Sequence, residues 1–435
     1  MKLVEILIEH YRCFESLTIP LQPDVTVFVG VNGAGKTAVL DAIALALSEI
    51  VAALGGHESA HQIRTSRLSD IFVPEKSGSP KSQNDGTFSL HTKFASHLNA
   101  PPLTDCSITF SDNHWSSSPT NLKQVLPASI KNFDCYPVIT YYRAKRRFNE
   151  MPNMGDLFNT TFDRTSALEN ALDAGTNYQA MCQWFYLREN EELRKKIRPG
   201  LGSDFEFSDL KAIRHALALT IEGVKQVFFD GVPPILKLSL TNLGGEPECR
   251  SLDQLSDGYR SLLAVILDFA RRLAVANPHL GNPLQAPGIL LIDEIELHLH
   301  PQWQQRIIPN LRQVFPNTQL IVATHSPAVL TTVHREQIRL IGSDHRLVEI
   351  PDDVGTYGAE NARVLAEVFG THGRPQHIET VQELRTYLAL IEARQHGSDA
   401  ALRLRNSLEA ALGRSDPDLL YADLRIKQLR ALIQP

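Results

Sequence analysis

Gly30-Val-Asn-Gly-Ala-Gly-Lys-Thr37 is the stretch of sequence that decides the fold of this chain. It satisfies the pattern G-x-x-x-x-G-K-[ST], follows the apolar run Val25–Val29 and leads into a helical pattern over Lys36–Ala53. The continuous apolar run is typical of a strand buried on both faces of a parallel sheet. Glycines let backbone N–H groups converge on an anion, and the helix adds its positive dipole end. The stretch therefore predicts an α/β fold with a phosphate-binding loop.

Two residues of this loop have expected chemical tasks. We expect Lys36 to reach the β- and γ-phosphates of a nucleotide and the Thr37 hydroxyl to bind Mg²⁺. A glycine-rich turn that contains Lys-Thr by chance is the alternative, and the correct flanking elements disfavour it. By itself the loop indicates only a nucleoside triphosphatase. The expected nucleotide contacts in and beside it are Gly30, Asn32, Gly33, Ala34, Gly35, Lys36, Thr37 and Ala38.

A second apolar strand, Gly288–Ile292, ends in two adjacent carboxylates, Asp293 and Glu294. We expect Asp293 to hold the magnesium ion. We expect Glu294 to polarise the attacking water as general base, a role worth about 10²–10⁴-fold in rate. A strand that merely ends in two solvated acids is the alternative, which the upstream phosphate loop disfavours.

Two further motifs lie on either side of these acids. Leu-Ser256-Asp-Gly258-Tyr-Arg-Ser opens an amphipathic helix over residues 259–276, so a serine and a glycine lie at a second anion-binding helix end. A plain helix cap without a ligand is the alternative. Downstream, a buried strand over Gln319–Ala323 leads to a single histidine, His325, a position that is usually structural when it occurs alone.

The four motifs occur in the order and context of the ABC-type ATPases, which the chain resembles over residues 1–345. The resemblance implies ATP and Mg²⁺ as ligands, an ATPase with Lys36, Glu294 and His325 as catalytic residues, and a homodimer or higher even homo-oligomer. In this family the signature serine and glycine, here Ser256 and Gly258, contact the γ-phosphate held by the opposite subunit. The switch histidine senses that phosphate and steadies the attacking water.

The start of the chain resembles the SMC and RecF branch of that family. There an aromatic-flanked arginine follows the first strand, and Arg12 in Tyr11-Arg-Cys-Phe14 matches it. The resemblance implies that Arg12 lies near the nucleotide, with a solvated surface arginine as the alternative. No sustained heptad pattern is present, which excludes an SMC coiled-coil arm. The tail after residue 350 lacks the alternating strands of a Toprim domain, which disfavours an OLD nuclease.

The nearer resemblance is to the Septu-type and retron-linked ATPases of bacterial anti-phage defence. It implies an ATP-regulated switch subunit that controls a separate HNH nuclease, since this chain has no convincing HNH pattern. The runner-up is a RecF-like DNA-repair ATPase that binds DNA, and a transporter ATPase is a more distant third. The stretches that carry the nearer resemblance are Tyr136–Tyr142, Asp293–Pro301, Thr356–Asn361 and Arg374-Pro375.

The predicted fold class is thus α/β: an ABC-type P-loop domain with an antiparallel β lobe, a helical lobe and a C-terminal helical extension. Other predicted elements are strands over residues 2–8, 17–19, 87–94, 107–110, 136–142, 225–229 and 235–240, and helices over residues 167–198, 209–222 and 302–315. The predicted domains are an ATPase lobe (1–150), a helical lobe with strands (151–250), a segment with the signature, acids and histidine (251–350) and the extension (351–435). Charged amphipathic helices in the extension are candidates for docking a partner, with a self-contained cap as the alternative.

Two features depart from the family pattern. The loop after Tyr142 should carry a magnesium-contacting glutamine, but it reads Arg143-Ala-Lys-Arg-Arg147, so another residue serves or hydrolysis is slow. That basic run is a candidate for contact with DNA or RNA or with a nucleotide, with a solvated, salt-bridged surface as an equal alternative. His298 and His300 suggest zinc at first sight, but no further ligand is positioned by the sequence, and we prefer a structural or dimer-contact role.

The composition and the start of the sequence indicate the environment of the protein and limit its partners. The net charge of −6 gives no global attraction for nucleic acid, although it leaves room for a local basic patch. The five cysteines are scattered without a C-x-x-C pair, which predicts a reduced environment rather than a disulfide framework. The start lacks the order of a secretion signal, and the most apolar stretch, 39–54, falls short of a membrane span. We therefore expect a cytoplasmic protein without a membrane partner.

Overall fold

The protein is described here by a computed structural model. It describes residues 1–56, 63, 87–95, 105–111, 114–118, 135–144, 162–172, 178–198, 202, 204–221, 223–231, 234–241, 245–371 and 373–431. The contacts within the chain define two compact units, Met1–Asn361 and Ala362–Pro435.

A six-stranded sheet in the order β14-β13-β3-β12-β11-β7 forms the centre of the first unit. The five strands from β13 to β7 run parallel, and β14 is antiparallel to β13. Every residue of β3, β7, β11 and β12 is buried, which explains their continuous apolar sequences. The bounds are β3 Val25–Gly30, β7 Val138–Tyr142, β11 Gly288–Ile292, β12 Thr318–Ala323, β13 Ile338–Ile341 and β14 Leu347–Val348.

A second sheet is antiparallel, in the order β2-β1-β4-β5-β6. Helix α1 (Lys36–Ala53) contacts strands of both sheets and is buried nearly all round, so it is the layer between them. The predicted strands of this lobe are confirmed, and β6 was not predicted because its sequence, His-Trp-Ser-Ser-Ser, is polar. The bounds are β1 Lys2–Tyr11, β2 Phe14–Pro20, β4 Phe88–Ala95, β5 Asp105–Ser111 and β6 His114–Ser118.

The helical lobe combines helices with a three-stranded antiparallel sheet, β10-β9-β8. The helix predicted from Ala167 was wrong at its start, because residues 165–168 form a 3₁₀ helix and the α-helix begins at Tyr178. The bounds are η2 Thr165–Leu168, α4 Tyr178–Ile197, α5 Ser208–Thr220, β8 Val224–Asp230, β9 Ile235–Thr241, β10 Pro247–Ser251, η3 Leu252–Gln254, α6 Asp257–Ala276 and η4 Pro283–Gln285.

The single helix predicted over residues 302–315 was also wrong. The structure has two helices there, α7 (Pro301–Gln304) and α8 (Ile307–Val314), with Gln305 and Arg306 between them. Pro309 supplies the physical reason, because a proline has no N–H to bond the carbonyl four residues earlier and its ring clashes with that carbonyl. Two short helices follow β12, namely α9 (Pro327–Leu330) and η5 (Arg335–Gln337).

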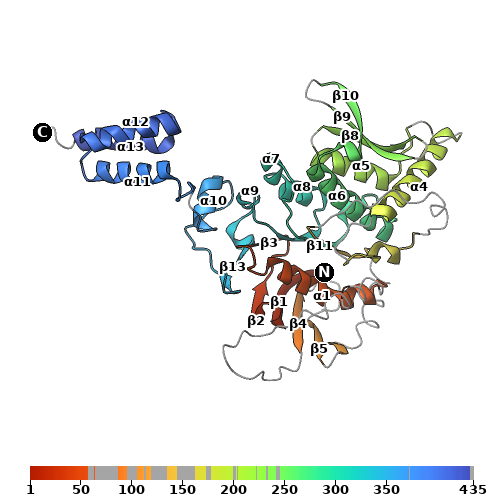
Figure 1. The fold of residues 1–435 in the computed structure, drawn as a ribbon. Helices are drawn as coiled ribbons and strands as arrows, with labels where there is room; N and C mark the ends of the chain where they lie inside the picture. Colours follow the sequence, from red (N-terminus) through yellow and green to blue (C-terminus); the bar gives the residue numbers. More distant parts are fainter. Residues whose placement is uncertain are drawn as a thin grey trace. The chain divides into compact units, whose positions relative to one another are not determined.

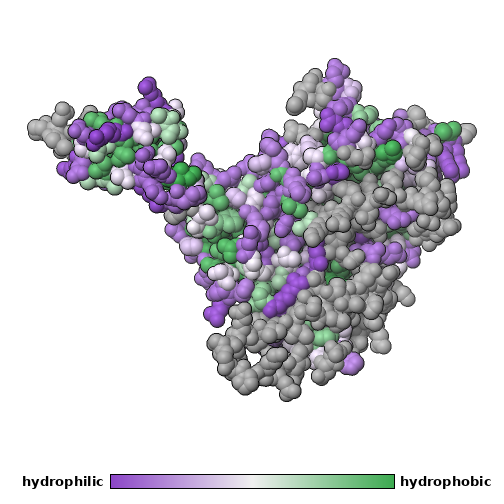
Figure 2. All heavy atoms as spheres, viewed as in Figure 1, coloured by the Kyte–Doolittle hydropathy of each residue, from purple (hydrophilic) through white to green (hydrophobic). Residues whose placement is uncertain are grey.

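Helices α11, α12 and α13 of the second unit pack side by side (Figure 1), in line with the helices predicted for the tail. Their shared core includes Leu384, Ile391, Leu408 and Leu419. Figure 2 shows hydrophobic side chains next to hydrophilic ones on the visible surface of this unit. The helices are α11 Glu379–Glu392, α12 Asp399–Leu412 and α13 Pro417–Ala431, and α10 (Asn361–Glu367) begins at the boundary between the units.

This architecture confirms the predicted fold class: an α/β phosphate-loop domain with an antiparallel lobe, a helical lobe and a helical extension. None of the described helices combines the length and apolarity needed to cross a lipid bilayer. In the central sheet β12 lies between β3 and β11. Because these strands and β7 are parallel, the segments that follow them meet at one edge of the sheet, formed by the carboxyl ends of the strands. This edge is where α/β proteins bind ligands.

Candidate active site

The phosphate loop connects β3 to α1 in a conformation that depends on its glycines. Gly33 and Gly35 have φ of 81° and 105°, in the left-handed region that favours glycine. A Cβ atom on Gly35 would lie 2.5 Å from Cζ of Phe14 and 2.9 Å from Sγ of Cys13. No side chain caps α1, so its first N–H groups remain available for an anion. Val31, Asn32 and Gly33 are exposed, whereas Ala34 and Ala38 are buried.

Lys36 lies inside the curve of this loop. Its Nζ donates hydrogen bonds of 3.0 Å to the carbonyl oxygens of Gly30 and Val31. Burial lowers the pKa of Lys36, and the nearby carboxylates Asp293 and Glu296 partly oppose that shift. A buried ammonium surrounded by carbonyls and acids is suited to exchange these partners for phosphate oxygens.

Thr37 and Asp293 come together although they are distant in the sequence. The Thr37 hydroxyl donates a 2.8 Å hydrogen bond to Oδ2 of Asp293, and Asp293 is buried at the end of β11. The backbone N–H of Asp293 donates to the carbonyl of Tyr142 on the neighbouring strand, which fixes its position. A hydroxyl and a carboxylate oxygen are hard donors of the kind that Mg²⁺ prefers, so these two residues fit that ion.

Glu294 occupies a turn directly after the strand. Its φ of 46° lies in the left-handed region, which is uncommon for a residue with a side chain. The next residue, Ile295, donates its N–H to the carbonyl of Ala323 at the end of β12, which holds the turn against the sheet. Backbone strain of this kind costs about 1–3 kcal/mol and concentrates at functional sites. Glu294 is half-buried and within electrostatic reach of Lys36.

His325 follows β12 and is positioned by a residue that the sequence analysis missed. The backbone N–H of His325 donates a 2.6 Å hydrogen bond to Oε1 of Glu296, and the Thr324 hydroxyl donates a 2.7 Å bond to the other oxygen. Glu296 thus ties the histidine loop to the turn after β11. Its position two residues after Glu294 was visible in the sequence, but nothing there distinguished an anchoring carboxylate from a solvated one.

The signature residues lie at the N-terminus of α6. Ser256 is exposed and its side chain makes no capping hydrogen bond, although it occupies the N-cap position. Gly258 is required by packing, because a Cβ there would overlap the carbonyl of His298. No hydrogen bond among the described residues joins Ser256 or Gly258 to the phosphate loop. Within one copy of the chain, described hydrogen bonds link the loop to Asp293 and the turn after β11 to His325, but none links the signature residues to the phosphate loop.

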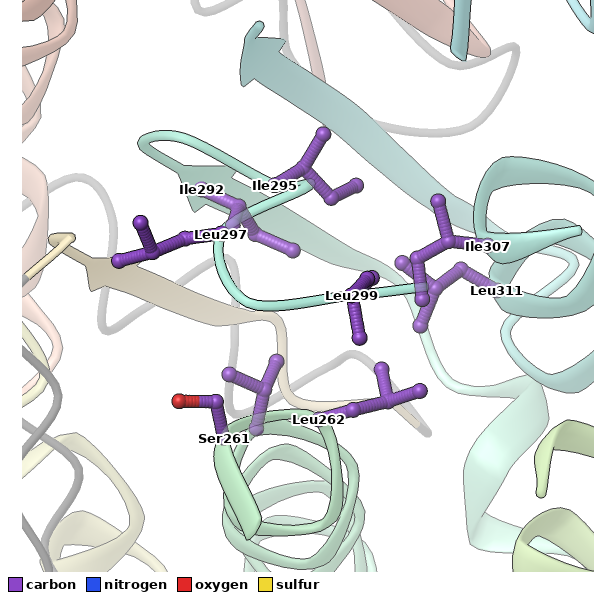
Figure 3. A pocket seen from close by; sticks show the side chains of 9 residues that line it. Ser261, Leu262, Ile292, Ile295, Leu297, Leu299, Ile307 and Leu311 are labelled. Carbon is purple, nitrogen blue, oxygen red and sulfur yellow. The ribbon is translucent and has the colours of Figure 1, made fainter. Parts of the chain in front are cut away.

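The segment after the acids packs on α6. Ile295, Leu297 and Leu299 gather between β11 and α6, with Leu262 of α6 facing them (Figure 3). The cavity left among these side chains is only about 10 Å³, at the limit of what a single water needs. The turn that carries Glu294 and the helix that carries Ser256 therefore share one close-packed apolar interior.

Arg12 lies in the turn between β1 and β2, next to the residues that cover Gly35. Its φ is 51°, and its guanidinium pairs with the carboxylate of Asp41 on α1 at 2.7 Å. His345, which the sequence analysis did not single out, also contacts the loop: its Nδ1 lies 3.1 Å from the carbonyl oxygen of Ala34. The first contact attaches the turn after β1 to α1, and the second attaches a distant segment to the phosphate loop.

The remaining candidates are placed as follows. The His300 ring accepts a 3.3 Å hydrogen bond from the N–H of Gln302 and caps α7, and exposed His298 has a φ of 63° beside Gly258. Within the described part of the chain, no group of three or more His, Cys, Asp or Glu side chains could hold a metal. Arg143 pairs with Asp41, and the rest of the basic run, Lys145, Arg146 and Arg147, lies outside the described residues.

Comparison with known proteins gives consistent matches. A family model described as an AAA ATPase domain matches residues 1–199, and a second AAA-domain model matches residues 161–331. The chain is 27% identical to the "Retron Ec83 probable ATPase" of Escherichia coli, over 98% of this chain and 87% of that protein. It is also 27% identical to the "Retron Vc95 probable ATPase" of Vibrio cholerae, over 91% and 84%. A stretch of 79 residues, 18% of this chain and 11% of its relative, is 39% identical to Septu protein PtuA of Bacillus mycoides. The chain is therefore homologous to the retron ATPases and to Septu protein PtuA, and its first 331 residues match models of AAA ATPase domains.

Proposed function

We propose that this protein binds and hydrolyses ATP with Mg²⁺ in two sites shared between two copies of the chain, and that this cycle controls a separate HNH nuclease. The contact between Thr37 and Asp293 is the observation that carries the proposal. It joins the phosphate loop to the acids of β11 at the edge where a nucleotide would lie. Lys36 is already among oxygen atoms there, ready to exchange them for phosphate.

Each residue has a proposed task in binding. The exposed part of the loop wraps the phosphates with backbone N–H groups, and Lys36 neutralises the β- and γ-phosphates. Thr37 and Asp293 would hold Mg²⁺, which would neutralise negative charge on the phosphates.

Hydrolysis is proposed to depend on two further groups. Glu294 accepts the proton of the attacking water, and it lies in a turn with a left-handed backbone conformation directly after the strand. His325 hydrogen-bonds the γ-phosphate and the water, and Glu296 holds the histidine loop in place. Both groups follow buried strands, which give a rigid foundation for positioning.

The proposal of a shared site is supported by the state of Ser256. A serine at the N-cap of a 20-residue helix normally bonds the backbone, whereas this one makes no capping bond and is exposed. An exposed helix N-terminus with a serine hydroxyl suits the γ-phosphate of a nucleotide bound to a second copy. Two such sites, related by two-fold symmetry, would close a homodimer.

The control of a nuclease is supported by the relatives and by the second unit. The chain matches retron ATPases over nearly its whole length, and part of it matches Septu protein PtuA. Helix α13 buries Leu419 and Ala422 but exposes Leu420, Tyr421 and Leu424. An apolar surface in excess of what the core requires suits a protein partner. We place the nuclease contact on this unit.

The glutamate is the best single test of the site. Glu294→Gln removes the base but keeps the size and polarity of the side chain, so we expect ATP binding to persist while hydrolysis falls about 10²–10⁴-fold. Trapped ATP should then hold the dimer, which native mass spectrometry with ATP and Mg²⁺ would detect. Lys36→Ala should weaken nucleotide binding itself.

Glu336→Gln is the matched control, since Glu336 is an exposed acid of the first unit outside the site. It should hydrolyse ATP at the parental rate and form no trapped dimer. If Glu294→Gln also hydrolyses ATP at the parental rate, the assignment of the base is wrong.

A further inference from the structure

The hairpin formed by β13 and β14 contacts the phosphate loop at two places. In the parallel pairing of β13 with β3, Ile341 is the partner of Gly30, the first residue of the loop. A Cβ atom on Gly30 would overlap the carbonyl oxygen of Ile341, so the two backbones are in close contact. In the turn of the hairpin, His345 meets the carbonyl of Ala34. The hairpin therefore holds the loop at its start and again before α1.

His345 is fixed both by its backbone and by its ring. Its φ of 61° lies in the left-handed region, and its N–H donates a 3.1 Å hydrogen bond to the carbonyl of Gly342 within the turn. The imidazole meets the Phe14 ring edge-to-face, with centroids 6.1 Å apart and planes at 87°. Phe14 is buried and is the side chain that covers Gly35. The imidazole is thus held beside the loop by two independent contacts.

The contact between His345 and Ala34 determines which imidazole nitrogen carries a proton. The distance from Nδ1 to the carbonyl oxygen is 3.1 Å, which is within the range of a hydrogen bond. A carbonyl oxygen can only accept, so Nδ1 must carry the proton and donate it. His345 therefore acts as a fixed donor to the backbone of the loop.

This hydrogen bond also determines the direction of the next N–H in the loop. The carbonyl of Ala34 and the N–H of Gly35 belong to one planar trans peptide, in which they point in opposite directions. Because the carbonyl points toward His345, the N–H of Gly35 points away from the hairpin. Among the residues that the structure describes, none accepts this N–H. It therefore stays available for an anion, next to the uncapped start of α1.

We infer that His345 is a positioning residue for phosphate binding: it holds the Ala34 carbonyl and so aims the N–H of Gly35 at the phosphates of the nucleotide. This inference rests on the proposed function. The backbone N–H groups of such a loop surround the α- and β-phosphates, so His345 acts on a contact that ATP and ADP share. A peptide that is already oriented loses less freedom when the ligand binds, which increases affinity.

Three variants separate the hydrogen bond from the packing. His345→Asn keeps an N–H donor close to the place of Nδ1 and suits the left-handed backbone, but it loses the ring. His345→Phe keeps a ring against Phe14 but cannot donate. His345→Leu, which has the branched shape of Asn, is a second variant without a donor. Position 345 is half-buried in a turn, so the fold should be kept in all three.

The affinities of the full-length protein for ATP and ADP are measured by calorimetric titration, with EDTA to prevent hydrolysis. His345→Phe and His345→Leu should each lower both affinities about 5- to 30-fold, as expected when a hydrogen bond to a charged group is weakened. His345→Asn should stay within about twofold of the wild type. With Mg²⁺, KM for ATP should rise in the two variants without a donor, and kcat should change by less than about twofold, because His345 does not contact the attacking water.

His334→Phe is the matched control. His334 is an exposed histidine of the same unit, and its ring also contacts an aromatic ring, that of Tyr357, with centroids 4.3 Å apart. It lies far from the loop, since the nearby Gln337 donates a 2.9 Å hydrogen bond to Asp24, which precedes β3. This variant should leave both affinities and KM unchanged.

The outcomes separate this inference from the proposed function. Wild-type protein that binds neither nucleotide would overturn both. If the wild type binds ATP and the variants without a donor bind it equally well, the role of His345 alone is wrong. The same holds if His345→Asn binds more weakly than His345→Phe, because that order indicates packing of the ring rather than the hydrogen bond.

Discussion

His325 has surroundings that keep its imidazole neutral. Burial of the ring, and then the nearby Lys36 ammonium, lower the pKa of His325 below its ordinary value of 6.5, although Glu296, Glu294 and Asp293 oppose that shift. The protonated form is therefore scarce at pH 7. A neutral imidazole has one nitrogen that accepts a hydrogen bond and one that donates, which suits a residue placed between a phosphate and a water.

This surrounding leads to a prediction about pH. kcat/KM for ATP should decrease as the pH is lowered, with a midpoint below pH 6.5, because protonation removes the accepting nitrogen of His325. His325→Gln should lower kcat/KM about 10²–10⁴-fold and abolish this decrease. Steady-state rates across about pH 5 to 8 would measure both effects. His279→Gln, at an exposed histidine, is the control and should keep the parental profile. A midpoint at or above 6.5 would contradict the role given to His325.

The residues of the site divide into those that sequence reveals and those that only the fold reveals. Lys36, Thr37 and Asp293 were predicted as site residues because their spacing and flanking strands repeat a known chemical pattern, and in the structure Thr37 donates a hydrogen bond to Asp293. Asp41 and Glu296 were not identified. Each acts by pairing with a group far away in the sequence, and a carboxylate gives no local sign of such a partner.

At the level of elements, β7 connects two helices through its last two residues. The Tyr141 hydroxyl donates to Asp41 on α1, and the Tyr142 hydroxyl donates a 2.7 Å bond to Asp268 on α6. Successive strand residues point to opposite faces, so the two tyrosines reach helices on either side of the sheet. Helix α1, which follows the phosphate loop, and helix α6, which follows Ser256, are thus hydrogen-bonded to the same strand.

Asp268 is the centre of a buried ionic cluster. Arg271 and Arg272 each donate to it at 2.8 Å, and all three side chains are buried. Burial alone would raise the pKa of Asp268, but Arg272 and Arg271 outweigh this effect and hold its pKa below the ordinary value. The cluster therefore keeps a carboxylate charged inside the protein, which requires all its partners.

We predict that Asp268→Asn lowers the free energy of unfolding by about 3–5 kcal/mol, because two buried guanidinium groups lose their counter-charge. Urea unfolding followed by circular dichroism would measure the change. Asp257→Asn on the same helix is the control: that carboxylate is exposed, and its pair with Arg260 should contribute no more than about 1 kcal/mol. Equal losses for the two variants would show that burial of the cluster has no special importance.

The predicted elements succeeded or failed for identifiable reasons. β3 and β11 were predicted with bounds close to those observed, because each lies deep in the core and has an almost continuously apolar sequence. α1 was predicted with the same bounds because it begins in the phosphate-loop motif and is apolar over most of its length. β6 was missed because its sequence is polar, although it pairs with β5, which ends only three residues before it. The helix over residues 302–315 was predicted from its apolar period, which does not register the break imposed by Pro309.

At the level of the whole molecule, the two units carry different tasks in our proposal. All the proposed nucleotide contacts lie in Met1–Asn361, and the second unit has its own core of residues such as Leu384, Ile391 and Leu408. Binding of a partner to the second unit therefore need not disturb the nucleotide site. The two activities should be separable by mutation.

The exposed face of α13 allows that separation to be tested. The triple change Leu420→Ser, Tyr421→Ser and Leu424→Ser removes apolar side chains without touching the buried core. The fold should therefore be kept, and the ATPase rate should change by less than about twofold. Loss of the apolar contact should abolish co-purification of an HNH nuclease expressed from the same operon, because such anchors dominate binding energy at protein interfaces. Leu193→Ser with Ile197→Ser, at exposed apolar positions of α4, should retain the nuclease. Retention by the triple variant as well would move the nuclease contact off the second unit, while loss of ATPase activity in that variant would show that the two units do not act independently.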